Sequence, residues 1–236
     1  MRFQRELIPA TLIRRYKRFL ADCRLSDGRE VVAHVANPGA MTGLTEPGSR
    51  IWLEPNDDPK KKLDYGWRLL ETPEGALVGV DTSQPNRMLK EALLAGKVPR
   101  LAGFPNLRAE VPYGTNSRVD FLLSGPEGPL HVEVKSVTTL RQPGLAEFPD
   151  CVTKRGAKHM AELADVVAQG GRAMVFFLAQ RSDAQRVAVA SDLDPGYGAA
   201  FRAAVDAGVE VLAHRAELSP QGIELGPELP FLDRRD

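Results

Sequence analysis

The sequence has little cysteine and no long apolar run. Cys23 and Cys151 are the only cysteines among 236 residues, too few for a disulfide framework or a zinc site. No apolar run approaches the ~20 residues of a membrane span. The first residues, Met1 to Leu7, also lack the apolar core of a signal peptide. We therefore expect a soluble cytoplasmic protein with reduced thiols and no membrane partner.

The sequence also lacks net charge and several catalytic signatures. Its 31 basic and 31 acidic residues balance, so no global positive field indicates nucleic-acid binding. Residues 1–30 hold eight bases against four acids, whereas residues 181–236 hold six against ten, so a phosphate-bearing partner would meet the front of the chain. There is no Walker loop, no G-x-G-x-x-G and no nucleophile-elbow serine, and the four histidines are scattered. These absences exclude the commonest nucleotide-binding and serine-hydrolase sites.

Residues 1–82 are predicted to form one small domain of short strands. Phe19–Leu25 alternates in polarity, and the turn signal Asp27-Gly28 separates it from Val31–Val35. Three further short runs are separated by Pro-, Gly- and Asp-rich turns: Ile51–Leu53, Tyr65–Leu70 and Ala76–Val80. Five or six short strands without a clear helix predict a small antiparallel barrel.

Residues 83–236 are predicted to form a second domain of the α/β class. Helical periodicity appears over Pro85–Ala95 and Thr153–Ala168, and Asp194-Pro195 opens a third helix that Gly208 closes. Strands are predicted near 107–113, 118–123, 130–138, 172–179 and 209–213. No long linker and no repeat separates the two parts.

Two predicted strands of the second domain each carry one acid. Asp120 lies in Ser117–Leu123, and Glu133 lies in Leu130–Lys135, with Lys135 two residues beyond it. If the strands pair as a hairpin, both carboxylates converge, and Glu133 and Lys135 share one face. Two carboxylates and an ammonium suit a Mg²⁺-dependent phosphodiester-cleaving site, with Mn²⁺ as a substitute. The alternative is a surface hairpin whose charges are only solvated or paired.

Further ligands are available nearby. The Val134 carbonyl lies between Glu133 and Lys135, and Glu91 and Glu110 are candidate extra acids. The predicted site is thus a catalytic set of Asp120, Glu133 and Lys135, with the metal ion held by the two acids.

The helix predicted from Thr153 begins with an unusual excess of cations. Lys154, Arg155, Lys158 and His159 crowd its first turns, although a helix N-terminus favours acids. An anion that binds at this helix N-terminus would explain the excess of cations there. The alternative is that Glu162 offsets Lys158 and water screens the rest, with Asp150 or Thr153 as a simple cap. Arg155, Lys158 and His159 are therefore candidate DNA contacts.

Arg14–Phe19 interleaves cations with aromatic residues. This composition is typical of a strand that faces nucleic acid, with rings stacking on bases and cations meeting phosphates. Its candidate DNA contacts are Arg14, Arg15, Lys17 and Arg18. The alternative is an edge strand whose charges prevent aggregation while Tyr16 or Phe19 enters the core.

Taken together, these segments resemble the sugar fermentation stimulation protein A family of prokaryotes. The matching stretches are Arg15–Asp22, Ala33–Gly43, Gly79–Asn86, Glu110–Phe121, Val132–Thr138 and Phe148–His159. The resemblance implies an N-terminal OB-type barrel, a PD-(D/E)XK nuclease-like domain, DNA binding and a role in regulating sugar metabolism genes. It places Asp120 on the family's nuclease-like aspartate, and Glu133 and Lys135 on its acid-x-lysine. Pro38 and Cys151 depart from the family pattern without touching this set.

Three functions remain open from the sequence. The first is a DNA-binding protein with a Mg²⁺-dependent nuclease site. The second is a non-catalytic DNA-binding regulator that keeps the same residues as relics. The third is a module that binds RNA or a protein, which the zero net charge favours over tight nonspecific DNA binding. A homodimer is a further expected assembly.

Overall fold

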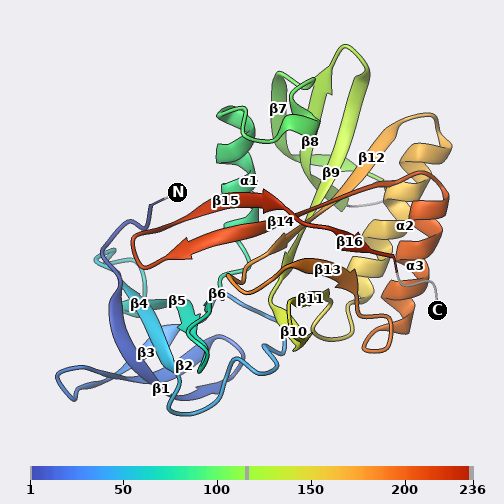
Figure 1. Cartoon of the computed structure of the whole chain (residues 1–236). Helices are drawn as coiled ribbons and strands as arrows, with labels where there is room; N and C mark the ends of the chain where they lie inside the picture. Colours follow the sequence, from blue (N-terminus) through green and yellow to red (C-terminus); the bar gives the residue numbers. More distant parts are fainter. Residues whose placement is uncertain (1, 115–116, 234–236) are drawn as a thin grey trace.

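The computed structural model describes residues 2–114 and 117–233 and shows two domains side by side (Figure 1). The first holds the strands β1 (Ile8–Tyr16), β2 (Leu20–Leu25), β3 (Glu30–His34), β4 (Arg50–Pro55), β5 (Tyr65–Glu71) and β6 (Leu77–Gly79). They run in the order β3-β2-β1-β4-β5-β6, and parallel pairing of β3 with β5 closes the barrel. Leu12, Ile51 and Trp67 are fully buried in its core.

The prediction of a single basic strand over Arg14–Phe19 is wrong. β1 ends at Tyr16, and Lys17 and Arg18 form a turn with φ of 47° and 62° before β2 begins at Leu20. Ala21, Cys23 and Leu25 face the core as their alternation predicts, whereas Phe19 stays 44% exposed. The cations therefore lie around the tip of a hairpin instead of along one strand.

Within the described residues, the second domain contains one large sheet, one small sheet and three α-helices. Its elements are α1 (Gln84–Leu94), a short 3-10 turn (Pro99–Leu101), β7 (Asn106–Tyr113), β8 (Ser117–Gly125), β9 (Gly128–Val137), β10 (Thr139–Gln142), β11 (Leu145–Phe148), α2 (Lys154–Ala168), β12 (Arg172–Ala179), β13 (Arg186–Val189), α3 (Pro195–Asp206), β14 (Glu210–Ser219), β15 (Gly222–Glu228) and β16 (Phe231–Leu232). The large sheet has the order β15-β14-β12-β9-β8-β7, and the small one has the order β10-β11-β13-β16. The prediction of a small barrel followed by an α/β domain is confirmed.

Apolar layers cover both faces of the large sheet. Alternate residues of β12 point to opposite faces, with Phe176 packing on the α1 side and Phe177 on the side of α2 and α3. This explains why β12 reads as a continuous apolar run. α1 buries Met88, Leu89 and Ala92 against the sheet. Figure 1 shows α2 and α3 together on the far side of the sheet from α1.

The helix ends follow the local sequence. Pro85 lies in the first turn of α1. The Thr153 side chain caps α2 by accepting a hydrogen bond from the Gly156 amide, and Asp194 caps α3 by accepting one from Tyr197. Of the two caps considered for α2, Thr153 is therefore the one used. None of the helices in the described part of the chain has the length and apolarity needed to cross a membrane.

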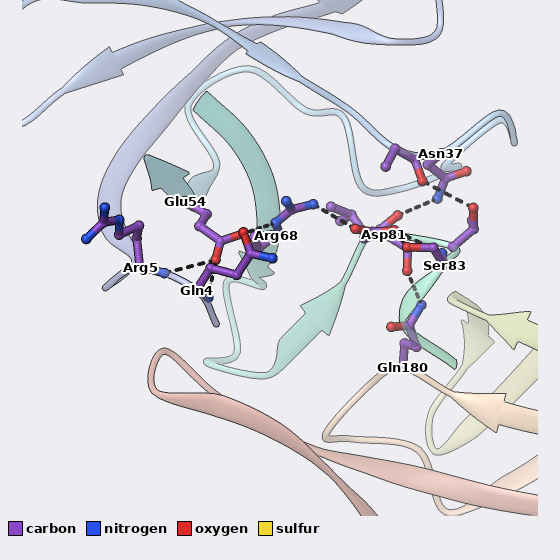
Figure 2. A network of polar contacts seen from close by, with 11 residues as sticks. Gln4, Arg5, Asn37, Glu54, Arg68, Asp81, Ser83 and Gln180 are labelled. Carbon is purple, nitrogen blue, oxygen red and sulfur yellow. Dashed lines mark hydrogen bonds and ion pairs between the residues drawn. The ribbon is translucent and has the colours of Figure 1, made fainter. Parts of the chain in front are cut away.

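A polar network joins the barrel to the second domain (Figure 2). Arg68 of β5 lies between two buried carboxylates, 2.7 Å from Glu54 and 2.7 Å from Asp81. Gln180, just after β12, donates a hydrogen bond to the Asp81 carbonyl at 3.1 Å. Asp81 also accepts hydrogen bonds from Ser83, at the start of α1. The buried ion pairs therefore lie within the barrel, and the hydrogen bond from Gln180 to Asp81 links them to the second domain.

The boundary predicted between residues 82 and 83 lies between β6 and α1. Leu7 and Leu69 of the barrel domain also pack into the apolar cluster that α1 forms with the large sheet. The outer limits of the predicted domains, residues 1 and 236, lie outside the described residues. The division of the chain at 82 and 83 stays a prediction.

Candidate functional site

The two acid-bearing strands form the expected hairpin. β8 and β9 are antiparallel, with Phe121 opposite Val132 and Gly125 opposite Gly128. This register brings Asp120 and Glu133 to the same level of adjacent strands. Glu133 and Lys135 share a face, and the Lys135 ammonium lies 2.7 Å from Glu133 Oε1. The convergence of these three side chains is thus built into the pairing of the hairpin.

The Asp120 carboxylate is held by two nitrogen donors. Its Oδ2 accepts a hydrogen bond of 2.7 Å from the Val134 amide, and its Oδ1 accepts one of 2.7 Å from Asn86 Nδ2 on α1. Burial and the nearby charge of Glu133 nevertheless raise the pKa of Asp120 to about 6. The site therefore fixes the position of Asp120 while making its negative charge costly.

Glu133 is buried and is contacted by side chains at only one of its two oxygens. Its Oε1 accepts a hydrogen bond from Lys135 and contacts Nδ1 of His159 on α2. Burial acts to raise the pKa of Glu133, but Lys135 and His159 outweigh it and hold this pKa below its ordinary value. Its second oxygen, Oε2, is buried and has no hydrogen-bond partner among the described residues.

This donor set fits a hard divalent cation. Mg²⁺ takes oxygen ligands and usually keeps several waters, so two carboxylates and a substrate phosphate suffice. A cation would give Glu133 Oε2 a partner and would offset the negative charge of Asp120, which burial and Glu133 make unfavourable. Within residues 2–114 and 117–233, no group of three or more His, Cys, Asp or Glu side chains is arranged to hold a metal ion. The protein itself would thus supply two carboxylates instead of a complete cage.

The three residues line a cleft of about 840 Å³ between the domains. The barrel contributes Arg18 and the loop Asn37–Gly39, and the second domain contributes the start of α1, β8, β9 and the start of α2. Among the predicted site residues, this cleft is lined by Asp120, Glu133, Lys135, Glu110, Arg18, Arg155 and His159.

The two extra acids are placed differently. Glu110 of β7 lines the cleft and has a φ of 54°, a left-handed conformation that is unusual for a residue with a side chain. Glu91 lies on α1 in a separate pocket beside β15. The structure therefore places Glu110 in the same cleft as the two acids and Glu91 outside it.

The remaining basic candidates do not line the cleft. Arg14 pairs with Asp22 at 2.7 Å, Lys17 is exposed in the hairpin turn, and Lys158 pairs with Glu162 at 3.5 Å. This last pair agrees with the simpler explanation for the basic helix start.

Arg15 stabilises a loop of the barrel. It donates hydrogen bonds to the carbonyls of Asn37, Gly39 and Ala40, and so organises the loop that forms the barrel wall of the cleft. Asp150 accepts a hydrogen bond of 3.0 Å from the Met41 amide in the same loop, across the domain boundary.

Sequence reasoning missed three cleft residues, namely Asn86, Arg87 and Arg118. Asn86 and Arg87 lie in the first turns of α1, where polar residues are ordinary, so nothing in the local pattern distinguishes them. Arg118 could have been found from the sequence, because it lies two residues before Asp120 on β8 and therefore shares its face.

Replacing Asp120 with asparagine is expected to change how stability depends on pH in the presence of chelator. A raised pKa in the folded state means that Asp120 favours folding below its unfolded pKa of 3.8 and loses this contribution as the pH rises through about 6. Relative to wild type, the free energy of unfolding of Asp120→Asn should therefore rise by about 2 kcal/mol between pH 4 and pH 8. Urea unfolding at both pH values measures it. If variant and wild type differ in free energy of unfolding by the same amount at both pH values, the buried environment described for Asp120 is contradicted.

Comparisons with known proteins agree with this architecture. Residues 13–80 match the family model described as the SfsA N-terminal OB domain, and residues 83–222 match the sugar fermentation stimulation protein RE domain. The sugar fermentation stimulation protein homologs of Ruegeria pomeroyi and Roseobacter denitrificans are both 60% identical to this chain, over 97% and 98% of it and 100% and 99% of their own lengths. The solved structure of Pyrococcus furiosus SfsA in complex with Ca²⁺ is 28% identical, with a TM-score of 0.88 over 99% of this chain and 98% of that one. The OB assignment of the barrel is confirmed.

Proposed function

The chain belongs to the sugar fermentation stimulation protein A family, and we propose that it binds DNA and hydrolyses phosphodiester bonds in the cleft between its domains. The second domain would be of the PD-(D/E)XK nuclease type, with Mg²⁺ as cofactor and Mn²⁺ as a substitute. The observation that carries the proposal is the buried Glu133, which has Lys135 on one oxygen and no hydrogen-bond partner among the described residues on the other.

Each site residue has a role that follows from its contacts. Asp120 and Glu133 would hold the metal ion, and Asn86 and the Val134 amide keep the Asp120 carboxylate in place. A bound divalent ion would polarise the scissile phosphate and lower the pKa of a coordinated water. The Lys135 ammonium, fixed by Glu133, offsets negative charge on that phosphate. His159 restrains Glu133 from the α2 side.

Cations beside the cleft would meet the DNA backbone. Arg18 and Arg155 line the cleft itself, while Arg14, Lys17 and Lys158 are exposed nearby on the same two elements, the β1–β2 hairpin and the start of α2. Such contacts give affinity without base sequence information. Arg15 would act indirectly through the loop that it organises. A homodimer stays a prediction.

Incubation of the purified protein with plasmid and with single-stranded DNA tests the proposal. Cleavage should appear with Mg²⁺ or Mn²⁺ and disappear with chelator, and DNA retention on gels should weaken as salt rises. Retention without cleavage at any metal concentration would remove the enzymatic part. The absence of both retention and cleavage would remove the whole proposal.

A non-catalytic DNA-binding regulator of sugar metabolism genes is the second candidate. It is favoured by one observation, that Lys135 and His159 both contact Glu133 Oε1 and so stabilise this carboxylate from within the protein. Such a protein would bind DNA equally well in Mg²⁺ and in chelator, and would leave plasmid intact.

Asn86→Ala tests the support of the metal-binding carboxylate. Removing the amide leaves Asp120 with one donor, the Val134 amide. Loss of such a supporting hydrogen bond lowers metal affinity by about 10- to 100-fold. Calorimetric titration with Mn²⁺ measures this, and Asn106→Ala on β7, outside the cleft lining, is the control. Equal Mn²⁺ affinity in Asn86→Ala and wild type would contradict the role given to Asn86.

A further inference from the structure

We propose that the cleft accepts an unpaired DNA strand in preference to an intact duplex. The inference rests on the proposed function for the chemistry of the site, but it concerns which form of DNA can enter. Four observations carry it: the depth of the acids, the fixed walls of the cleft, its cationic and apolar lining, and an aromatic pair at its rim.

The two carboxylates lie too deep in the cleft for phosphates on the outer surface of a duplex to reach them. Glu133 and Lys135 are only 4% and 8% exposed at the bottom of the cleft. The cleft volume of about 840 Å³ lies in the range of pockets that enclose a small ligand. A duplex is stiff and wide, so its phosphates cannot reach the bottom of such a cleft. A single strand is flexible and can bend one phosphate inward, because it has no paired strand that must move with it.

Two sets of contacts fix the width of the cleft. In the first, Asp150 of the second domain accepts a hydrogen bond from the Met41 amide, in the barrel loop that Arg15 holds. In the second, Gln180 donates a hydrogen bond to the carbonyl of Asp81, whose side chain pairs with Arg68 (Figure 2). Opening the cleft for a duplex would break buried polar contacts, each of which is costly to leave unmade.

Two arginines in the lining are available for phosphates. Arg87 of α1 and Arg118 of β8 are exposed, and neither makes an ion pair with another described residue. With Arg18 from the barrel and Arg155 from α2, they line the same cleft as Asp120 and Glu133. A strand that enters the cleft would therefore meet guanidinium groups from four different segments of the chain.

The lining also offers apolar surface that a duplex cannot use. Val152, just before α2, is 66% exposed, and Pro38 and Pro149 line the cleft beside it. In a duplex the faces of the bases are stacked inside, so such groups gain contacts only with unpaired bases.

An aromatic pair continues this surface onto the barrel. Phe19 follows Arg18 at the cleft rim, is 44% exposed, and stacks on His34 with ring centroids 6.4 Å apart. Val32, 37% exposed, lies two residues from His34 on the same face of β3. An unpaired strand that leaves the cleft past Arg18 would therefore find a stacking platform.

Fluorescence anisotropy in chelator tests the preference without turnover. The probes are one labelled DNA strand, the same strand in a duplex, and its RNA equivalent. We expect about tenfold tighter binding of the single DNA strand than of the duplex. Equal or tighter binding of the duplex overturns the inference, and so does tighter binding of RNA than of single-stranded DNA.

Matched variants separate phosphate contacts from stacking. Arg87→Ala combined with Arg118→Ala should reduce the slope of log affinity against log salt by about 1.4, since each single-strand phosphate contact contributes about 0.7. Arg108→Ala, exposed on β7 outside the cleft lining, should leave the slope unchanged. Phe19→Ala should weaken single-strand binding about fivefold or more, and Leu94→Ala, a 73% exposed control on α1, should not. Equal effects in variant and control would overturn the assigned path.

The outcomes also separate this inference from the proposed function. A single-strand preference without any metal-dependent cleavage supports the inference and removes only the enzymatic proposal. Metal-dependent cleavage with duplex preferred in both binding and rate keeps the enzyme and overturns the inference.

Discussion

Replacing Arg68 with methionine is expected to lower the free energy of unfolding by about 3–5 kcal/mol, because it leaves two buried carboxylates without their shared cation. Arg68 is the only residue that bridges Glu54 and Asp81 in the described network, and the side chains of these acids are 8% and 5% exposed. For a chain of this size, each kcal/mol corresponds to about 2–4 °C, so the melting temperature should fall by about 6–20 °C.

Arg24→Met is the matched control for this result. Arg24 pairs with Glu30 at 2.9 Å, but both side chains are more than half exposed, so its loss should cost less than about 1 kcal/mol. Urea unfolding of both variants measures the difference. If Arg68→Met loses no more stability than Arg24→Met, the buried ion pairs of Arg68 do not stabilise the barrel as described.

Glu133→Gln is expected to remove Mn²⁺ binding and to reduce cleavage about 10³-fold or more. Glutamine keeps the shape of the side chain, but it takes away the charge that would balance a divalent ion beside Lys135. A loss of about 4 kcal/mol of metal-derived stabilisation of the transition state corresponds to this factor. Binding of DNA should be retained or slightly tightened, since one negative charge leaves the cleft.

Glu91→Gln serves as the matched variant, because Glu91 lies on α1 in a different pocket. Its cleavage rate should match that of wild type. A similar loss of cleavage in both variants would show that the site extends along α1 as far as Glu91, which the geometry does not support.

The hairpin could be predicted because its information is local. Strand periodicity, a short Gly- and Pro-rich turn and acids at defined positions place Asp120 and Glu133 at one level once β8 and β9 pair. The three long helices were likewise signalled by periodicity and by Pro, Thr or Asp at their starts.

The small sheet β10-β11-β13-β16 could not be predicted in the same way. Its strands are two to four residues long, too short to show an alternating pattern, and β11 and β13 pair across the whole of α2 and β12. The position of β13 depends on tertiary contacts that no local pattern encodes.

The partner that each charged side chain contacts also depends on tertiary structure. The four cations of Arg14–Arg18 look alike in the sequence, yet Arg15 contacts loop carbonyls, Arg14 pairs with Asp22, and only Arg18 lines the cleft. Asn86 contacts an aspartate 34 residues away, which only the packing of α1 against the sheet brings near. Composition therefore predicted a basic strand, while its bend into a hairpin and the partners of its cations required the fold.

The central claim is that a divalent ion held by Asp120 and Glu133 carries out phosphodiester cleavage in this cleft. The most direct test is the single-turnover cleavage rate of a labelled DNA strand as a function of Mn²⁺ concentration. Wild type and Glu133→Gln are compared at equal DNA occupancy. We predict a rate that rises and saturates with Mn²⁺ in wild type and stays at background in the variant. Cleavage that survives chelator, or equal rates in the two proteins, would contradict the account.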